Sequence, residues 1–549
     1  MKMTLIGAAH QVTGSCTLIE WKTGRFMIVD YGMEQGENCY QMQDLPVLPA
    51  QIEYVVLTHA HIDHSGNLPL LYQRGFHGKI YATPETENLC NIMLADSAHI
   101  QETDAAYQTK KNLRTGLPEV KPAFTAEDAA NVMRMFRPCA YNDLIRIDEG
   151  LSVRFQDAGH LLGSAFAELF LEDEGKNVKL VCSGDVGNIN QPIIRDPQTI
   201  EEADYLLIES TYGTRTHDGG TDAIPVLTDI LRRTFSRGGT VIIPSFAVGR
   251  TQELLYFFRE IKQKRMLPEF QDFPVYVDSP LANEATAIFL QCDTACLDDD
   301  AKAVMISGEN PIWFDGLHTV VSSDESKALN TDDMPKVIIA SGGMCEGGRI
   351  RHHLKHNLWD ERNTVMFAGY QAAGTLGRII YDGAKQVKIL GETIDVKAEI
   401  TLLSGISGHA DKPGLLRWLD SYKQKPAAVF VNHGDDESCT GLAAAITEQF
   451  GIPAYAPYSG SCFDLAAGEW VRLTDPVYKK EEKKKSGNSA PAVKKEQLYR
   501  ELVEAGENLM QRIRELEGHS NAEIKSLTGK IRTLMKQDQP ESSKKSLRD

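Results

Sequence analysis

A cluster of potential metal ligands lies within six consecutive positions of the sequence. Three histidines and one aspartate stand there, in the order His59, His61, Asp63 and His64. The apolar run 55–57 leads directly into the cluster, which places the four side chains in a loop after a buried strand. Neutral imidazoles and a carboxylate are good zinc ligands, and ligands this close in sequence can converge on one ion. The pattern therefore predicts a metal site rather than a polar loop of hydrogen-bonded histidines.

Three further residues stand where a strand ends or a tight turn begins. Asp30 follows the apolar run 26–29, His160 follows Asp-Ala-Gly, and Asp185 follows Ser-Gly. Taken singly, each is weak evidence, because an aspartate between glycines is common in turns. Their order after the histidine cluster makes them stronger candidates.

The order of these motifs resembles the metallo-β-lactamase superfamily, whose signature is His-x-His-x-Asp-His. Three later motifs narrow the resemblance to the β-CASP family of RNA-processing nucleases. They are 206–213 with Glu209, 403–411 with His409, and 429–435 with His433. The resemblance covers about residues 1–475, and a histidine at position 433 resembles the RNA-acting branch of the family. It implies an α/β fold, namely the four-layer αββα metallo-β-lactamase fold with an inserted parallel α/β β-CASP domain.

The resemblance also implies a site for two zinc ions per chain. One ion would be held by His59, His61, His160 and Asp185, and the other by Asp63, His64, Asp185 and His433. Asp185 would then bridge the two ions. Asp30 would not bind an ion itself but would accept a hydrogen bond from a ligating histidine, since such histidines usually donate their free N–H to a carboxylate or carbonyl.

Cleavage of an RNA phosphodiester requires a nucleophile, a clamp for negative charge and a proton for the leaving ribose oxygen. Two metals about 3.5–4 Å apart can share a hydroxide and polarise the phosphoryl oxygens. A histidine is suited to protonating the leaving oxygen at neutral pH, and the resemblance assigns this role to His409, oriented by Glu209. We also expect Asp63 to serve catalysis. Direct attack on phosphorus would leave 5′-phosphate and 3′-hydroxyl ends.

Three glycine-containing segments of the expected insertion each contain an arginine. They are 244–250, 341–349 and 374–378, and free backbone N–H groups at a strand-to-helix junction can face a phosphate. The substrate-binding candidates in or beside these segments are Arg250, Ser341, Gly342, Arg349, His353 and Arg378. Phe246 and Tyr370 could stack on bases, but we expect both to pack in the core.

Periodicity and turn residues divide the chain into several parts. Strands are expected at 3–8, 15–20, 25–30, 54–58, 151–156, 165–171 and 178–183, with helices at 84–114 and 125–137. Helices at 221–236, 250–264 and 349–358 then alternate with strands at 240–243, 274–277 and 336–340, which is typical of a parallel sheet. Strands resume at 395–403 and 428–431. We therefore expect a metallo-β-lactamase domain at 1–210 and 387–475, interrupted by a β-CASP domain at 211–386.

Residues 476–549 are expected to form a charged linker and a helical C-terminal extension. Apolar residues recur every three or four positions between 498 and 534, which predicts two amphipathic helices. Their apolar stripe has to be buried somewhere, so we expect a homodimer contact. The extension contains 17 Lys and Arg against 12 Asp and Glu, which allows it to help in holding RNA but gives it no expected part in the chemistry.

The overall composition is that of a globular enzyme. The chain has 549 residues, of which 42% are hydrophobic and 24% charged. It contains no apolar run of about 18 residues that could cross a membrane and no signal-peptide pattern, so we expect a cytoplasmic protein. The ten cysteines contain no Cys-x-x-Cys pair, which argues against a disulfide framework. The net charge of −18 argues against general coating of nucleic acid, but it permits single-stranded RNA in a local cleft.

Two other functions stay open from the sequence. A hydrolase of another ester on the same scaffold, such as a thioesterase or lactonase, would explain the zinc motifs but not Glu209, His409 and the large insertion. A non-catalytic RNA-binding subunit is opposed by the complete set of ligands. The sequence favours a zinc-dependent ribonuclease, and it does not distinguish an endonuclease from a 5′–3′ exonuclease.

Overall fold

The computed structural model describes residues 1–36, 39–217, 222–372, 374–403 and 405–479, together with Lys525 and Thr528. Residues 1–479 form one unit of the fold. The expected linker and the two helices expected between 498 and 534 lie outside the described residues, apart from those two positions.

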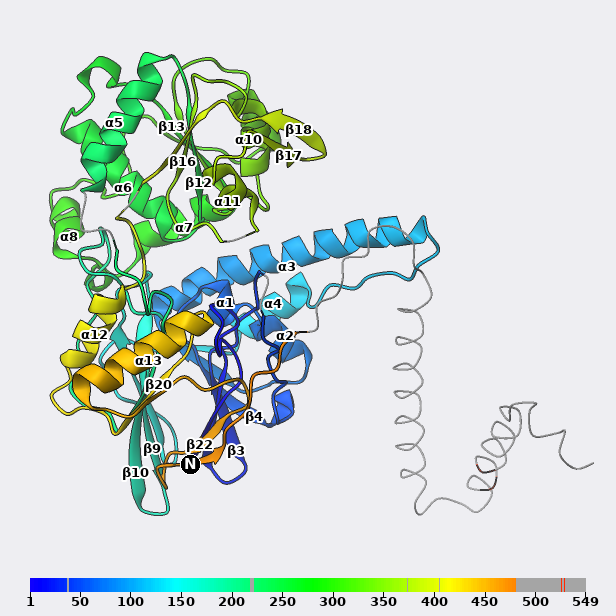
Figure 1. The fold of residues 1–549 in the computed structure, drawn as a ribbon, viewed down its shortest axis with the longest axis vertical. Helices are drawn as coiled ribbons and strands as arrows, with labels where there is room; N and C mark the ends of the chain where they lie inside the picture. The colour runs from blue at the N-terminus through cyan, green and yellow to red at the C-terminus, as the bar shows by residue number, and fades with distance from the viewer. Residues whose placement is uncertain are drawn as a thin grey trace, which may run out of the picture. The chain divides into compact units, whose positions relative to one another are not determined.

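Two β-sheets lie face to face in the part of the chain outside the expected insertion (Figure 1). Within the described residues, the first sheet has eight strands in the order β23-β22-β1-β2-β3-β4-β5-β6, and the second has seven in the order β21-β20-β11-β10-β9-β8-β7. The first sheet contains β1 (Lys2–Leu5), β2 (Thr17–Lys22), β3 (Arg25–Val29), β4 (Ile52–Val56), β5 (Lys79–Ala82), β6 (Phe136–Pro138), β22 (Cys462–Asp464) and β23 (Glu469–Arg472). The second contains β7 (Ile145–Asp148), β8 (Leu151–Asp157), β9 (Ala165–Asp173), β10 (Lys176–Cys182), β11 (Tyr205–Ile208), β20 (Ala428–Val431) and β21 (Ala454–Tyr455).

The apolar side chains of the two sheets meet in a shared core. In β8, buried and half-buried residues alternate along the strand, because successive side chains point to opposite faces of a sheet. Trp21 and Phe155 contribute large, fully buried side chains to this core from the first and second sheet respectively. This packing holds the two sheets, and therefore the loops at their edges, in a fixed relation.

Helices cover the outer face of each sheet, which completes the four layers. Leucines of α2 and α3 pack against the first sheet, and those of α12 and α13 pack against the second. The helices of this part are α1 (Ile62–Ser65), α2 (Leu68–Gln73), α3 (Pro84–Leu113), α4 (Ala126–Met133), α12 (Lys412–Asp420) and α13 (Asp436–Phe450). The αββα arrangement is the expected one.

The insertion is built on a parallel sheet of six strands among the described residues, in the order β14-β13-β15-β12-β16-β19. Its strands are β12 (Val241–Ser245), β13 (Val275–Asp278), β14 (Leu317–Thr319), β15 (Val337–Ser341), β16 (Thr364–Phe367) and β19 (Glu399–Leu402), and a separate hairpin is formed by β17 (Gln386–Ile389) and β18 (Glu392–Asp395). Its helices are α5 (Ala223–Ser236), α6 (Arg250–Gln263), α7 (Pro280–Gln291), α8 (Asp299–Ile306), α9 (Ser323–Leu329), α10 (Ile350–Asn357) and α11 (Leu376–Tyr381). The central strands are buried on both faces, which is why they read as continuous apolar runs.

Two expected elements differ from the structure. The helix expected at 125–137 ends at Met133, because Phe136–Pro138 forms β6 and pairs in parallel with β5. The strand expected at 395–403 forms as β19, but it pairs with β16 of the inserted sheet rather than with the first domain. The boundary expected at 386/387 is therefore too early, since the inserted sheet continues to Leu402.

Two further expectations from the sequence concern membrane-spanning helices and disulfide bonds. None of the helices in the described residues is both long and apolar enough to cross a membrane. All ten cysteines are free thiols, and most of them are buried.

Candidate metal centre

Each of the strongest site candidates follows the end of a strand closely. Asp30 comes directly after β3 and Glu209 directly after β11, while His433 lies two residues beyond β20. His160 and Asp185 each lie three residues beyond their strands, β8 and β10. The strands β8, β10, β11 and β20 run in the same direction and end at the same edge of the second sheet. Residues far apart in sequence therefore arrive at one place.

Two glycines allow these loops to approach closely. A Cβ added at Gly32 would lie 1.6 Å from the carbonyl oxygen of Asp63, and one at Gly187 would lie 1.8 Å from that of Gly159. The loop after Asp30 therefore packs directly on the backbone of the histidine cluster. The loop after Asp185 packs in the same way on the segment that carries His160.

The first group of candidate ligands comprises His59, His61, His160 and Asp185. The Nδ1 atom of His61 lies 3.1 Å from Nε2 of His59 and 3.2 Å from Nε2 of His160. The Oδ2 atom of Asp185 lies 3.4 Å from Nε2 of His59 and from Nε2 of His160. These four atoms thus face one common point.

The second group comprises Asp63, His64 and His433. The Nε2 atoms of His64 and His433 are 3.0 Å apart, and Nε2 of His433 lies 3.6 Å from Oδ2 of Asp63. The other carboxylate oxygen of Asp185, Oδ1, faces this group, at 3.3 Å from Nε2 of His64. Asp185 therefore lies between the two groups with one oxygen directed at each.

The protonation of the first group suits a metal. Burial lowers the pKa of His59, His61 and His160, and the neighbouring imidazoles lower it further; for His61 the value is about 3. Their rings are therefore neutral, which is the form that binds zinc. Burial disfavours the ionised form of Asp185, but the surrounding histidines outweigh this and hold its pKa well below its usual range.

Hydrogen bonds behind the ligands fix their tautomers. His64 Nδ1 donates to Asp30 Oδ2 at 2.8 Å, which leaves Nε2 free to bind an ion. Asp30 itself accepts from the backbone N–H and the hydroxyl of Thr58 at 2.8 and 2.9 Å. His160 Nδ1 donates to the carbonyl of Gly408 at 2.9 Å. Such partners orient ligating histidines and raise their basicity.

The contacts of the candidate ligands fit a bound metal ion. Oδ1 of Asp185 is buried, yet it has no hydrogen-bond partner among the described residues. The Nε2 atoms of His64 and His433 face each other at 3.0 Å, while Nδ1 of His64 is engaged with Asp30. Asp30 and His433 also have positive φ angles of 58° and 50°, a conformation that is unfavourable for a non-glycine residue and that the surrounding structure has to hold.

His409 lies beside the centre and pairs with Glu209. Its Nδ1 is 3.1 Å from Oε1 of Glu209 and 3.9 Å from Oδ2 of Asp185. Glu209 is held in turn by the backbone N–H groups of Val186 and Thr211, at 2.7 and 3.0 Å. Burial on its own would lower the pKa of His409, but the carboxylates of Glu209 and Asp185 outweigh it and raise the pKa to about 9.

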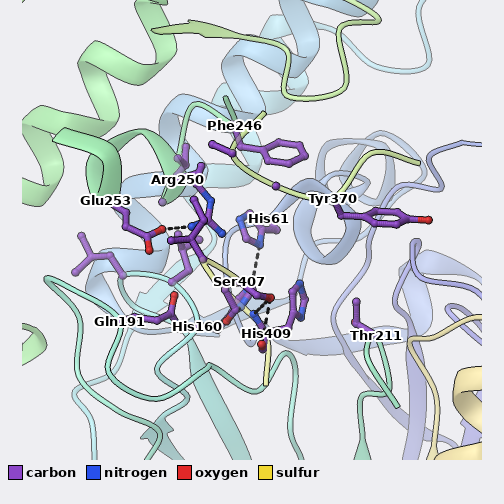
Figure 2. Close-up of a pocket in the computed structure, with 18 of the residues that line it drawn as sticks. His61, His160, Gln191, Thr211, Phe246, Arg250, Glu253, Tyr370, Ser407 and His409 are labelled. Carbon is purple, nitrogen blue, oxygen red and sulfur yellow. Dashed lines mark hydrogen bonds and ion pairs between the residues drawn. The ribbon is translucent and has the colours of Figure 1, made fainter. Parts of the chain in front are cut away.

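A cavity of about 410 Å³ opens beside His409, between the metallo-β-lactamase part and the insertion. His61, Asp63, His160 and His409 line one part of it, and Figure 2 shows three of these histidines with the residues opposite them. Most of the remaining wall is apolar, and it includes Leu161, Ile193, Val248, Phe289 and Ile406. Arg250 and Glu253 form an ion pair in the wall.

The candidate substrate-binding residues separate into two sets. Arg250 lines the cavity, whereas the other five do not. His353 is fully buried between Asp278 and Asn330, at 2.6 and 2.9 Å, so the expectation that it faces a substrate is wrong. Arg349 forms an ion pair with Asp278, and Arg378 forms one with Asp382. Ser341 is the last residue of β15, and Gly342 follows it.

Phe246 and Tyr370 are not core residues, which corrects the expectation for both. Each is 49% exposed and lines the cavity. Sequence reasoning also missed His217, whose Nε2 donates to the carbonyl of His409. It stands in a loop beyond Glu209, and no periodicity marks it, so the sequence offered only its position shortly after that motif.

Comparison with known proteins identifies the family of the chain. Three family models match in order: the metallo-beta-lactamase superfamily over residues 11–133, the Beta-Casp domain over 251–380, and the Zn-dependent metallo-hydrolase RNA specificity domain over 393–457. The chain belongs to the β-CASP family of RNA-processing nucleases within the metallo-β-lactamase superfamily. This family membership defines a metal-dependent ribonuclease.

Two relatives illustrate the membership. The chain is 37% identical over 443 residues to ribonuclease TTHA0252 of Thermus thermophilus, a match that covers 80% of this chain and 95% of that protein. It is 31% identical over 469 residues to the transcription termination factor FttA of Methanosarcina mazei, covering 83% and 70% respectively.

Proposed function

We propose that the protein hydrolyses single-stranded RNA with two zinc ions per chain and leaves 5′-phosphate and 3′-hydroxyl ends. The observation that carries this proposal is the position of Asp185, with one oxygen 3.4 Å from His59 and the other 3.3 Å from His64. A single carboxylate can serve two ions in this arrangement. The pair formed by His409 and Glu209 lies on the same side of the centre.

Each group of ligands has a distinct task. His59, His61 and His160 would hold one ion, Asp63, His64 and His433 the other, and Asp185 both. When bound, zinc supplies Lewis acidity towards the phosphoryl oxygens and lowers the pKa of water towards about 7. Burial lowers the pKa of the first group's imidazoles and keeps them neutral. In the second group, Asp30, itself held by Thr58, orients the ring of His64.

His409 would protonate the leaving ribose oxygen. Its raised pKa means that it carries a proton at neutral pH, and its ring lines the cavity, where a substrate can reach it. Glu209 stabilises the imidazolium and directs the ring, because its own carboxylate is fixed by two backbone N–H groups. After transfer, solvent would return the proton to His409.

The alternatives explain less of this arrangement. A thioesterase or lactonase would not account for the match to the RNA specificity domain over residues 393–457. A non-catalytic subunit would not need seven converging ligand residues and an oriented acid. The relative TTHA0252 is named as a ribonuclease, which supports the same substrate class.

The deciding experiment combines metal analysis with mapping of RNA ends. We expect about two zinc ions per chain, and cleavage of labelled single-stranded RNA that stops with a chelator and returns with zinc. Products should carry 5′-phosphate, and internal labels will report whether cuts are internal or proceed from the 5′ end. Products that end in 2′,3′-cyclic phosphate, or RNA that survives with zinc-loaded protein, would exclude the proposal.

The C-terminal extension has a separate predicted role. All candidate ligands lie before residue 476, so truncation there should leave zinc content and cleavage of a short RNA unchanged. Loss of the two expected amphipathic helices should lower the oligomeric mass from dimer to monomer, or weaken RNA binding at moderate salt. A truncated protein that keeps its zinc but cannot cleave a short RNA would contradict this division.

A further inference from the structure

Two large aromatic side chains stand half-exposed at the cavity beside the metal centre. Phe246 and Tyr370 are each 49% exposed, and both line the cavity. Burial of an aromatic ring away from water lowers the free energy of the protein. Two exposed rings next to a catalytic centre therefore indicate a surface that binds a ligand. The two residues are called the aromatic pair below.

The parallel sheet brings the aromatic pair together. Phe246 follows β12, and Tyr370 follows β16 by three residues. These strands pair directly and in parallel, so their carboxyl ends lie side by side at one edge of the sheet. Ligands bind at this edge in open parallel sheets. Figure 2 shows the two rings projecting from neighbouring loops above His409.

The loop that carries Tyr370 is tied to the loop after β15, which in turn lies against the ring of Phe246. The side-chain amide of Gln371 donates to the carbonyl of Gly343 at 3.0 Å and to the carbonyl of Tyr370 at 3.2 Å. A Cβ added at Gly343 would lie only 3.1 Å from the ring of Phe246, so glycine leaves the room that this ring occupies. The carbonyl of Phe246 accepts from the hydroxyl of Thr251 at 2.7 Å. The rings therefore stand on anchored backbone.

Cationic groups accompany the aromatic pair. The guanidinium of Arg215 lies 5.8 Å from the centre of the Tyr370 ring, which is within the range of a cation–π contact. Arg250 lines the same cavity and is held by Glu253. A surface that offers aromatic faces for bases and arginines for phosphates is the usual way in which proteins bind single-stranded nucleic acid without sequence preference.

We propose that the aromatic pair is a stacking platform for the bases of single-stranded RNA next to the phosphodiester that is cleaved. The occupant is a nucleobase rather than a protein side chain, because the platform is continuous with the cavity that reaches His409 and Asp63. The proposal rests on the proposed ribonuclease function and adds a base-binding subsite to it. Binding there tolerates every base, since each base has an aromatic face.

The test uses the full-length, zinc-loaded protein with the replacement His409→Ala, which prevents turnover of the RNA. Single-stranded RNAs carrying one 2-aminopurine, moved position by position, report stacking through quenching of its fluorescence. We expect strong quenching at positions next to the cleavage site, and its loss when Phe246→Leu and Tyr370→Leu are added. Each replacement should weaken binding about tenfold.

A matched control and an abasic RNA make the result specific. Trp359 is an equally exposed aromatic of the same insertion, 54% exposed, that does not line the cavity, so Trp359→Leu should bind RNA as the parent does. An abasic position should weaken binding to the parent but should not weaken binding to the double variant further.

The outcomes separate the two proposals. If the wild-type protein cleaves RNA while the double variant quenches 2-aminopurine as strongly as its His409→Ala parent, the platform is refuted and the ribonuclease proposal stands. Equal loss of affinity for abasic and intact RNA in the double variant would also refute stacking. If the wild-type, zinc-loaded protein neither binds nor cleaves single-stranded RNA, the proposed function itself fails.

Discussion

The imidazole of His217 donates a hydrogen bond from Nε2 to the backbone carbonyl of His409 across 2.9 Å. Two more bonds join the same segments. The backbone N–H of His217 donates to Oδ2 of Asp411 at 3.0 Å, and that of Lys412 donates to the carbonyl of Arg215 at 3.0 Å. The segment that leads into the insertion therefore holds the loop of His409 in place.

This relationship makes His217 a positioning residue for His409. We expect His217→Leu to lower kcat on a short RNA about fivefold, which corresponds to the loss of one hydrogen bond of roughly 1 kcal/mol. KM and zinc content should stay unchanged, because the side chain of His217 does not itself line the cavity and does not contact a candidate ligand. His217→Gln keeps an N–H donor of similar reach and should restore most of kcat. Equal kcat for all three proteins would show that the bond has no part in catalysis.

Asp185 should control both ions. Asp185→Ala removes the oxygens that face the two groups, so we expect the zinc content to fall from about two to below one per chain after dialysis. Asp63→Ala is the matched control, because Asp63 belongs only to the second group and should cost one ion at most. Elemental analysis of both variants checks this, and two ions retained by Asp185→Ala would contradict the bridging assignment.

His409 and Glu209 should act as one unit. His409→Ala should lower cleavage by about 10²–10⁴-fold, which is typical of losing a general acid, with zinc content unchanged. Glu209→Gln should act through the same step, so the double variant should be little slower than His409→Ala alone. Rates of the two single variants and the double variant, each with its zinc content, test this. Loss of zinc in His409→Ala would instead make His409 a ligand.

The buried carboxyl of Asp157 should make stability depend on pH. Burial raises its pKa to about 7, and the N–H of Gly159 at 2.9 Å offsets this only in part. A raised carboxyl pKa means that the folded protein holds this proton more tightly than the unfolded chain. Ionisation therefore lowers the free energy of unfolding, increasingly as the pH rises from about 4 to about 7.

Asp157→Asn removes this ionisation. At equal zinc content, we expect the variant to gain roughly 2 kcal/mol relative to the wild type between pH 5 and pH 8, at about 1.4 kcal/mol per pKa unit. Thermal or urea unfolding at the two pH values measures the difference. Asp148 is the control, because its pKa is shifted in the opposite direction. Hydrogen bonds from Tyr54 and Arg25 lower the pKa of Asp148 to about 2. The effect of Asp148→Asn should be the same at both pH values, whereas equal effects for Asp157→Asn would show that Asp157 is ionised throughout.

The local motifs of the site were predictable because the chain itself brings their members together. His59, His61, Asp63 and His64 lie within six residues, and each places an atom in one of the two groups. Asp185 could be selected from the sequence only through its order after that cluster. Its position between the groups depends on the ends of two strands, which no single segment encodes.

Tertiary packing decided the residues that were predicted incorrectly. His353 lies on a helix whose sequence carries three histidines, and only packing against Asp278 determined that this one is fully buried. Phe246 and Tyr370 have the composition of core residues, yet the edge of the parallel sheet leaves them open. Phe136–Pro138 pairs with β5 across more than fifty residues, so the local pattern of α4 gave no signal for a strand.

The path of the chain through the sheets also sets the order in which the protein matures during synthesis. Six of the seven candidate ligands, and Glu209, are made before the insertion begins, whereas His409 and His433 follow it. The strand β22, which pairs with β1, is made later still. A nascent chain therefore contains most of the candidate zinc ligands early, whereas His409, the proposed general acid, is added late.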